Sequence, residues 1–270
     1  MSDFLMYPIK YHPPRWQERI MTFMNSWAGF CPVCGKVTIF LMVLKENPRE
    51  SCFCIRCRAN NRKRQLAYIV CESISGIKNK KLRSLREIAK LNDIYIYNTE
   101  PNGAIHEILS HSRNYKFSGY FGAMHKSGDI IGKVEHQDLM ALSLQDESVD
   151  LAISADVFEH MPDPYLAHRE IYRILKPGGR HIFSVPFYQT GYLDEDRCII
   201  KDGQEIHLKE PVYHQDPLRN EGALVYKIFS LEMLCKLKHL GFSTNMYCIY
   251  KPGYGIIGNN GLIFEAIKPL

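Results

Sequence analysis

Residues 149–186 constrain the fold more than any other part of this chain. The stretch reads VDLAISADVFEHMPDPYLAHREIYRILKPGGRHIFSVP. Its first six residues form an apolar run typical of a buried parallel strand, and a polar, proline-marked loop over residues 156–164 follows. A helical pattern starts at Tyr165, and Pro177-Gly178-Gly179 predicts where that helix stops. Residues 180–185 then resume as a strand. The spacing predicts a right-handed strand–helix–strand unit, with its loop at the carboxyl edge of the sheet where α/β proteins bind ligands.

The helix of this unit has two predicted faces. Leu166, Ile171, Ile174 and Leu175 fall on the apolar face. The remaining positions are expected on the solvent side: His168, Arg169, Glu170, Arg173 and Lys176.

Strands and helices alternate through the chain from Asp93 onward, which predicts an α/β fold. The expected strands are residues 94–97, 116–121, 134–137, 149–154, 180–185, 242–250 and 261–268, and the expected helices are 104–110, 165–176 and 230–240. Residues 187–229 interrupt this rhythm with a polar, aromatic segment that we expect to be irregular. Because it leaves the fifth strand at the carboxyl edge, and because such long connections are usually functional, we interpret it as a lid insertion.

Cysteine spacing predicts a metal site before the α/β region. Five of the nine cysteines lie within 27 positions, and Cys31, Cys34, Cys54 and Cys57 form a C-x2-C-x19-C-x2-C pattern. Such a set binds Zn²⁺ as a tetrathiolate and leaves no open coordination position, so this zinc is expected to be structural. Cys52 could replace Cys54 as a ligand because it lies only two positions away, but only Cys54 completes the second CxxC pair. The competing interpretation is a group of reduced cysteines without a metal.

Charge is distributed unevenly along the 270 residues. Residues 45–90 hold 13 Lys or Arg against 4 Asp or Glu, a balance of +9. This basic segment is either a surface that binds nucleic acid or a solvated helical face, and the second is favoured. We divide the chain into a tail with an amphipathic helix (1–28), a zinc ribbon (29–61), a basic helical linker (62–91) and the α/β domain (92–270). No apolar run long enough for a membrane span and no signal-peptide pattern occur, which predicts a cytoplasmic protein without membrane contact.

The central stretch ESVDLAISADVFEHMPDPYLAHREIYRILKPGG closely resembles class I S-adenosylmethionine-dependent methyltransferases. HQDLMALSL resembles the end of that family's third strand, and CPVCG with CFCIRC resembles the zinc-ribbon leader of one bacterial subgroup. The resemblance implies a Rossmann-like, seven-stranded, mostly parallel sheet with helices on both faces. It also implies S-adenosylmethionine as the cofactor.

The same resemblance implies where the cofactor binds. Asp138 would contact the adenine with Leu139 beside the ring, and the loop containing Ser154, Ala155 and Asp156 would face the methionine part. Two features depart from the family. The glycine-rich turn after the first strand is reduced to Asn98-Thr-Glu-Pro-Asn-Gly103, and the second strand lacks the carboxylate that would hold the ribose. Glu100 is the nearest substitute, and Gly103 is the one glycine kept.

Candidates for catalysis come from the loop and the lid. His160 and His214 are possible general bases, because an imidazole titrates near neutral pH, and Tyr213 stands beside His214. The competing interpretation gives either histidine only a structural hydrogen bond.

Three functions remain open. The first is methyl transfer to an oxygen or nitrogen nucleophile of a small-molecule or glycan-like acceptor. The second is methylation of RNA or another nucleic acid docked on the basic segment, and the third is a binding module that has lost the cofactor. A dehydrogenase is disfavoured because no GxGxxG follows the first strand. The oligomeric state is not predicted.

Overall fold

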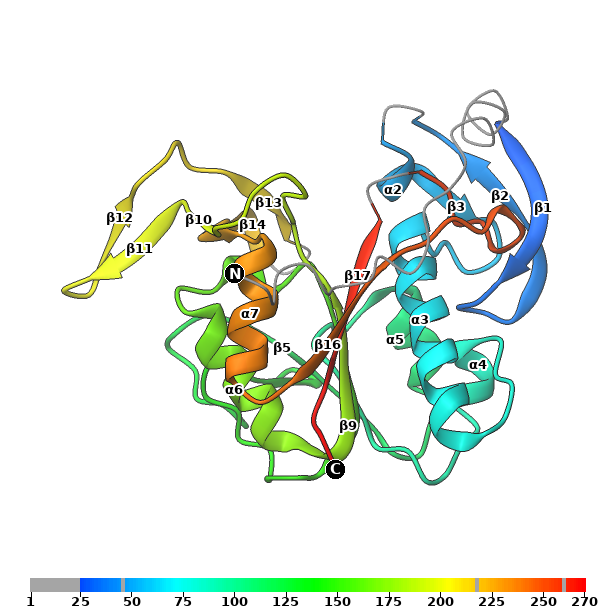
Figure 1. Cartoon of the computed structure of the whole chain (residues 1–270), viewed down its shortest axis with the longest axis horizontal. Helices are drawn as coiled ribbons and strands as arrows, with labels where there is room; N and C mark the ends of the chain where they lie inside the picture. Colours follow the sequence, from blue (N-terminus) through cyan, green and yellow to red (C-terminus); the bar gives the residue numbers. More distant parts are fainter. Residues whose placement is uncertain (1–24, 45–46, 217–218, 259–260) are drawn as a thin grey trace.

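An eight-stranded sheet forms the centre of the molecule (Figure 1). The computed structural model describes residues 25–44, 47–216, 219–258 and 261–270. Residues up to Met24, where the N-terminal amphipathic helix is predicted, lie outside the described residues. The strand order is β16-β17-β9-β8-β4-β5-β7-β6. The strands are β4 (Ile96–Asn98), β5 (Tyr115–Gly119), β6 (Ile130–Ile131), β7 (Val134–His136), β8 (Val149–Ala155), β9 (Leu175–Ser184), β16 (Ser243–Cys248) and β17 (Leu262–Ile267).

The sheet has the topology that the alternating pattern predicted. β4, β5, β7, β8 and β9 pair in parallel, while β17 runs antiparallel to both β9 and β16. The chain builds outward from β4 to β5 and β7 and then returns to place β8 on the other side of β4. Ligands of α/β sheets bind at such a switch point, beyond the carboxyl ends of the strands. The short β6 is an addition, forming a hairpin with β7.

Helices cover both faces of the sheet (Figure 1). α3 (Asn61–Lys78), α4 (Leu85–Ile88) and α5 (Gly103–Leu109) lie on one side, and α6 (Pro164–Ile174) and α7 (Leu231–His239) lie on the other. Alternate residues of β8 serve the two cores: Leu151 and Ile153 pack with α3 and α5, and Ala152 packs with α6. Within the described ranges, no helix combines the length and apolar character that a membrane crossing needs.

Residues 62–91 are not a linker, which corrects that prediction. α3 is one layer of the fold, and its buried Arg64 donates to the carbonyl oxygens of Ala59 and Gly255. The Arg64 guanidinium also lies 4.5 Å from the centre of the Phe40 ring. α3 therefore joins the N-terminal sheet to the C-terminal loop, and the short helix α4 follows it within the same segment.

The N-terminal sheet consists of β1 (Ser26–Cys31), β2 (Lys36–Met42) and β3 (Cys52–Cys54), all antiparallel, with α2 (Pro48–Ser51) before β3. β1 begins at Ser26, so the end of the predicted tail is already strand. Its apolar residues share one continuous core with α3 and with β8. Trp27 adds a hydrogen bond of 2.8 Å to the carbonyl oxygen of Pro252, which follows β16.

α6 begins at a capped N-terminus, where Asp163 accepts hydrogen bonds from the backbone of Tyr165 and Leu166. His168 was predicted on the solvent face, but it is fully buried and stacks on Phe158 with ring centres 4.2 Å apart. That prediction is wrong because α6 is covered on a second side by the loop after β8. β9 also starts earlier than expected: it takes in the Pro177–Gly179 turn, where Gly178 has φ 78°.

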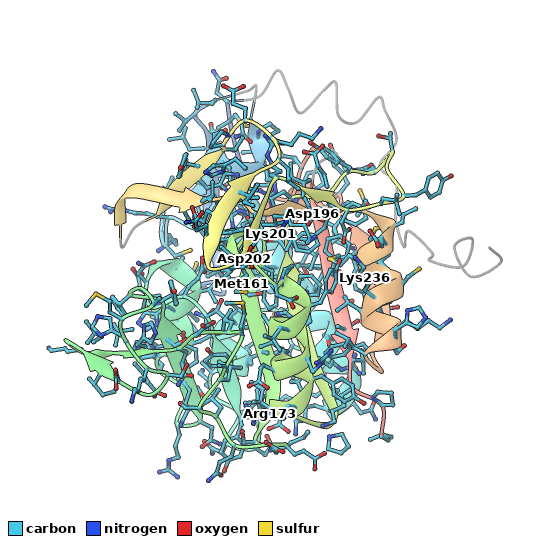
Figure 2. All side chains as sticks on the ribbon, turned by 90° about the vertical axis from the view of Figure 1, so that its left-hand side faces the viewer. Met161, Arg173, Asp196, Lys201, Asp202 and Lys236 are labelled. Carbon is cyan, nitrogen blue, oxygen red and sulfur yellow. The ribbon has the colours of Figure 1, made fainter. Side chains whose placement is uncertain are left out.

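The predicted irregular segment is mostly short antiparallel strand pairs, which corrects the expectation of irregularity. The pairs are β10 (Glu195–Asp196) with β15 (Lys227–Ile228), β11 (Cys198–Lys201) with β12 (Gln204–His207), and β13 (Tyr213–Asp216) with β14 (Arg219–Leu224). The β11–β12 hairpin projects from the body in Figure 1, and Figure 2 views it from that side with Lys201 and Asp202 labelled. The described residues also include two short 3₁₀ turns, η2 (Phe158–His160) and η3 (Pro252–Tyr254).

Candidate functional site

The loop after β4 presents polar atoms that have no partner. The Asn98 side chain donates to the carbonyl oxygen of Glu100 and to the Tyr115 hydroxyl, both at 2.9 Å. Its Oδ1 and the Thr99 hydroxyl are buried without a hydrogen-bond partner among the described residues. Gly103 opens α5 at φ 81°, and a Cβ there would meet no atom within 4 Å. Buried polar atoms without a partner are candidates for hydrogen bonds that a bound molecule completes.

The ends of β7 and β5 are the predicted positions for contacts with the adenine and the ribose. Asp138 and Leu139 follow β7, and Asp138 is held by a hydrogen bond from the Met140 backbone to its Oδ1 at 2.8 Å. Leu139 is buried in the core shared with α6. β5 ends at Gly119 and is followed by Tyr120 and Phe121, so no acid stands at the position of the missing ribose ligand.

Glu100 is paired with a cation from the N-terminal half of the chain. Its carboxylate contacts the Lys63 ammonium at the start of α3. Asn60 caps this helix by accepting from the Lys63 backbone at 2.9 Å. A cation in the first turn of a helix opposes the helix dipole, and here the Glu100 carboxylate offsets the charge of Lys63.

Asp156 is the most constrained residue of the loop after β8. It has φ 53°, a conformation rare outside glycine. Arg49 of α2 donates to its two carboxylate oxygens at 2.9 and 3.0 Å, Ser184 donates at 2.7 Å, and Arg62 lies 3.4 Å away. Burial acts to raise the pKa of Asp156, but Arg62 and Arg49 outweigh it and hold that pKa well below its usual range.

Ser154 and Ala155 end β8 beneath this loop. The Ser154 hydroxyl is fully buried and lies 2.9 Å from Nε2 of His181, on the side of the sheet covered by α6. Its side chain is therefore occupied inside the domain. Ala155 is buried in the other core, beside the residues of α3 and α5.

Three titratable groups meet where the lid crosses the loop. Glu159 and His160 lie next to each other in η2, and His214 reaches them from β13. Oε1 of Glu159 lies 3.6 Å from Nε2 of His160 and 3.5 Å from Nδ1 of His214. Tyr213 points elsewhere, since it precedes His214 on a strand and is 55 % exposed. The structure thus brings the two predicted histidines together and adds Glu159.

The charges in this cluster perturb one another. Burial raises the pKa of Glu159 above its usual value, and the Asp156 carboxylate acts in the same direction. Interaction with Glu159 raises the pKa of His214. Groups that shift each other's pKa inside a protein are often found at sites of proton transfer or ion binding.

The lid is attached to the body at two places near the cluster. The backbone of Tyr226 donates to the carbonyl oxygen of Glu159 at 2.8 Å. At its base, Asp194 accepts hydrogen bonds from the Tyr165 hydroxyl and from the backbone of Ser230. Since Tyr165 belongs to α6 and Ser230 precedes α7, these bonds fix the lid over the edge of the sheet.

The predicted thiolate set is assembled in the N-terminal sheet. The sulfur atoms of Cys31, Cys34, Cys54 and Cys57 all lie within 4.8 Å of one another. Those of Cys31 and Cys57 are 3.7 Å apart, close to the edge of about 3.8 Å expected for a tetrahedron with Zn–S bonds of about 2.3 Å. Cys52 is excluded as the alternative, because its sulfur faces Arg64 at 3.2 Å instead. The donor set therefore fits a zinc ion.

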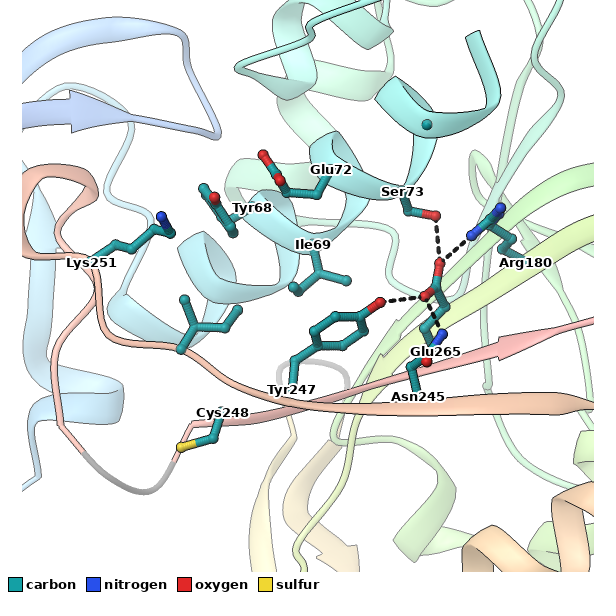
Figure 3. A pocket seen from close by; sticks show the side chains of 12 residues that line it. Tyr68, Ile69, Glu72, Ser73, Arg180, Asn245, Tyr247, Cys248, Lys251 and Glu265 are labelled. Carbon is teal, nitrogen blue, oxygen red and sulfur yellow. Dashed lines mark hydrogen bonds and ion pairs between the residues drawn. The ribbon is translucent and has the colours of Figure 1, made fainter. Parts of the chain in front are cut away.

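A separate cavity of about 440 Å³ lies between α3 and β16 (Figure 3). Its deepest acid is Glu265, which is 2 % exposed. This carboxylate accepts hydrogen bonds from Ser73, Arg180, Asn245 and Tyr247. Because four donors satisfy it, Glu265 joins α3 to the sheet rather than awaiting a ligand.

The residues at the switch point fit S-adenosylmethionine on structural grounds. The orphaned atoms of Asn98 and Thr99 offer polar contacts, and the space at Gly103 admits a ligand close to the backbone. Asp138 and Leu139 follow β7, which is separated from β4 by β5 in the sheet. Sequence reasoning missed Arg49 and the role of Glu159, since neither has a local pattern that marks it.

Comparisons with known proteins match the central part of this chain to methyltransferases. Residues 119–183 match the model of the methyltransferase domain. An uncharacterized methyltransferase of Mycobacterium avium is 36% identical over 67 residues, covering 23% of this chain and 26% of that protein. One from Mycobacteroides abscessus is 47% identical over 45 residues, or 17% of each. The chain thus aligns with about a quarter or less of the length of these relatives.

Solved structures with a similar arrangement carry methyltransferase names. A SAM-dependent methyltransferase of Methanosarcina mazei is 18% identical with a TM-score of 0.41, covering 68% of this chain and 96% of that one. An S-adenosylmethionine-dependent methyltransferase of Mesorhizobium loti has the same identity and TM-score, covering 68% and 95%. The match over residues 119–183 agrees with the resemblance of the central stretch to methyltransferases, and the sheet is the mostly parallel α/β sheet that the resemblance implied.

Proposed function

We propose that this protein transfers a methyl group from S-adenosylmethionine to an oxygen or nitrogen nucleophile of a small-molecule or glycan-like acceptor. The observation that carries the proposal is the position of the Glu159, His160 and His214 cluster. Glu159 and His160 follow β8 within the region that matches the methyltransferase domain, and His214 reaches them from β13 of the lid. The loop after β8 is the one from which class I enzymes are expected to face the methyl group.

The cofactor, when bound, supplies an electrophilic methyl group on its sulfonium. Asn98, Thr99 and Asp138 would hold it through the polar atoms described above. Methyl transfer depends mainly on holding the nucleophile in line and on excluding water. The lid and η2 provide that enclosure, because the backbone bond from Tyr226 to Glu159 joins them.

Proton transfer is assigned to the cluster. A hydroxyl or ammonium acceptor loses a proton when it is methylated, and an imidazole near neutral pH can take it. The carboxylate of Glu159 stabilises the resulting imidazolium, which is why the pKa of His214 is raised. His160 and His214 are both within reach of Glu159, so either ring can hold the proton.

A small acceptor is favoured over a nucleic acid by the partners of the basic segment. Arg49, Arg62 and Lys63 pair with acids of the site, and the guanidinium of Arg64 is buried. Lys78 pairs with Asp93. Cations with internal partners contribute little to phosphate binding, which supports the interpretation of this segment as structural.

The proposal includes a structural zinc ion on the four cysteines and a cytoplasmic location. The sulfur geometry supports the zinc, and thiolate ligands of this kind persist where cysteines stay reduced. Metal analysis of the purified protein should find about one zinc per chain held by this set. Protein that retains no zinc and folds normally would contradict this part.

Calorimetric titration with S-adenosylhomocysteine tests the main proposal. We expect saturable binding by the wild-type protein. Gly103→Val should abolish it, since the side chain would enter the open space at the start of α5. Gly132→Val is the matched control: Gly132 also has positive φ and no atom within 4 Å of its Cβ position, but it lies in the turn between β6 and β7. Absence of binding by the wild type at millimolar ligand would favour the binding-module alternative.

A further inference from the structure

The Glu159 carboxylate is the most unusual buried group of the molecule. Its side chain is 0% exposed, and neither oxygen has a hydrogen-bond partner among the described residues. An isolated buried carboxylate is strongly disfavoured unless a proton, a cation or hydrogen-bond donors compensate it. The two groups that face it are imidazole nitrogens, at 3.6 Å for His160 and 3.5 Å for His214. What lies between these atoms decides the chemistry of the cluster.

The tautomer of His160 follows from its second contact. Its Nδ1 lies 2.8 Å from the carbonyl oxygen of Leu224. A carbonyl oxygen only accepts hydrogen bonds, so Nδ1 carries the hydrogen, and the neutral ring presents a bare Nε2 to Glu159. In that neutral form a lone pair faces a carboxylate oxygen, and the two acceptors need a proton or a cation between them. Histidines that bind metals commonly donate their other N–H to a backbone carbonyl in this way.

The distances are those of ligands around one ion. A direct hydrogen bond between imidazole and carboxylate would be about 2.7–2.9 Å. Ligand bonds of about 2.0–2.1 Å to a tetrahedral metal place neighbouring ligand atoms about 3.4 Å apart. The observed separations of 3.5 and 3.6 Å lie close to the second value, and one ligand atom from each of the three residues falls within 4.8 Å of the others.

The backbone holds all three ligands in place. Glu159 and His160 are consecutive in η2, which the bond from Tyr226 fixes. His214 pairs with Ala223 across the β13–β14 hairpin, where a Cβ on Gly222 would lie 2.6 Å from the His214 carbonyl oxygen. This close approach requires glycine and sets the path of the strand that carries His214.

We propose that Glu159, His160 and His214 bind a divalent transition-metal ion, with zinc the best match to two imidazoles and one carboxylate. Three protein ligands leave a fourth position open, as in catalytic rather than structural zinc sites. That position suits a hydroxyl oxygen of the acceptor, so this inference deepens the proposed function and rests on it for its catalytic meaning. The ion takes the place of the shared proton in the cluster, so with the ion bound the histidines act as ligands instead of as the general base. A coordinated acceptor hydroxyl would then lose its proton to water, because coordination lowers its pKa. The nearby Asp156 is already neutralised by Arg49 and Arg62, so it stays outside the ligand set.

Zinc content and zinc calorimetry on the full chain test the site. After dialysis, we expect two zinc ions per chain in the wild type, one in the cysteine set and one in the cluster. Glu159→Gln and His214→Ala should retain one, with affinity for the second lowered at least about 100-fold. His239→Ala is the control, because His239 is an exposed histidine at the end of α7, and it should retain two. Glu159→Gln removes a buried charge without removing volume, so the metal-free variant should melt no lower than the metal-free wild type.

Titration with Mn²⁺, followed by water proton relaxation, separates the two sites, because this ion prefers oxygen and nitrogen ligands to thiolates. We expect one Mn²⁺ site in the wild type and none in His214→Ala. One zinc per chain in the wild type with no Mn²⁺ site, or binding unchanged in both variants, would overturn the inference and leave a proton-sharing cluster. Binding of S-adenosylhomocysteine is measured on the same samples. If S-adenosylhomocysteine binds but the cluster holds no metal ion, this inference alone is overturned. If the cluster holds a metal ion but S-adenosylhomocysteine does not bind, the methyltransferase proposal alone is overturned.

Discussion

The ion pair between Arg49 and Asp156 attaches the N-terminal sheet to the loop that carries Glu159 and His160. Arg49 donates two hydrogen bonds, of 2.9 and 3.0 Å, in the fork geometry that suits a carboxylate. Breaking a buried pair costs about 3–5 kcal/mol, but Asp156 would keep Ser184 at 2.7 Å and Arg62 at 3.4 Å. We therefore expect Arg49→Met to lower the free energy of unfolding by about 2–3 kcal/mol.

Urea denaturation followed by tryptophan fluorescence and circular dichroism measures this change. Arg49→Lys should lower the free energy of unfolding by an intermediate amount, since an ammonium keeps the charge but not the paired donors of the guanidinium. Arg56→Met is the control, because Arg56 donates only to the carbonyl oxygen of Val37 at an exposed position, and it should change stability by less than about 0.5 kcal/mol. If Arg49→Met stayed within that margin, the reasoning would fail, and Arg62 would be the partner that holds Asp156.

The same pair gives stability a defined pH dependence. The folded-state pKa of Asp156 is lowered, so its contribution is complete above the usual range of an aspartate and is lost as pH falls through the lowered pKa. Arg49→Met removes one of the two arginines that lower this pKa. The acid loss of stability should therefore move to higher pH in the variant, as read from urea midpoints at successive pH values.

Three further outcomes are expected. Burial lowers the pKa of His168 to about 3, so the neutral ring contributes fully to stability above about pH 6.5. Toward pH 3 the free energy of unfolding should fall by up to about 1.4 kcal/mol per pH unit. His168→Phe should flatten this dependence of the urea midpoint on pH, and the same slope in the variant and the wild type would refute the assignment. Gly76→Ala, inside α3 with nothing within 4 Å, should raise the free energy of unfolding by about 0.5–1 kcal/mol, whereas Gly29→Ala would place a Cβ 2.5 Å from the Gly253 carbonyl oxygen and lower it. By metal analysis, Cys54→Ser should lose the structural zinc and Cys52→Ser should keep it, and the opposite result would contradict the assigned ligands.

The central unit could be predicted because its signals are local. The apolar run of β8, the capping Asp163 and the Pro177–Gly179 turn each act over a few residues, and the observed bounds differ from the predicted ones mainly at the start of β9. The cluster of four cysteines could also be predicted, since two CxxC pairs define a candidate ligand set by spacing alone. His168 was misplaced because periodicity identifies one apolar face and does not reveal a second buried side.

The sequence by itself determined the α/β alternation, the thiolate set and the loop at which the site would lie. Only the tertiary structure decided what that loop contacts. Arg49 and Asp156 are 107 residues apart, and His214 reaches Glu159 through a hairpin that leaves and rejoins the sheet. Such contacts depend on how separate elements pack, not on the propensities of neighbouring residues. The buried carboxylate beside two histidines is therefore a property of the fold that no short motif in the chain encodes.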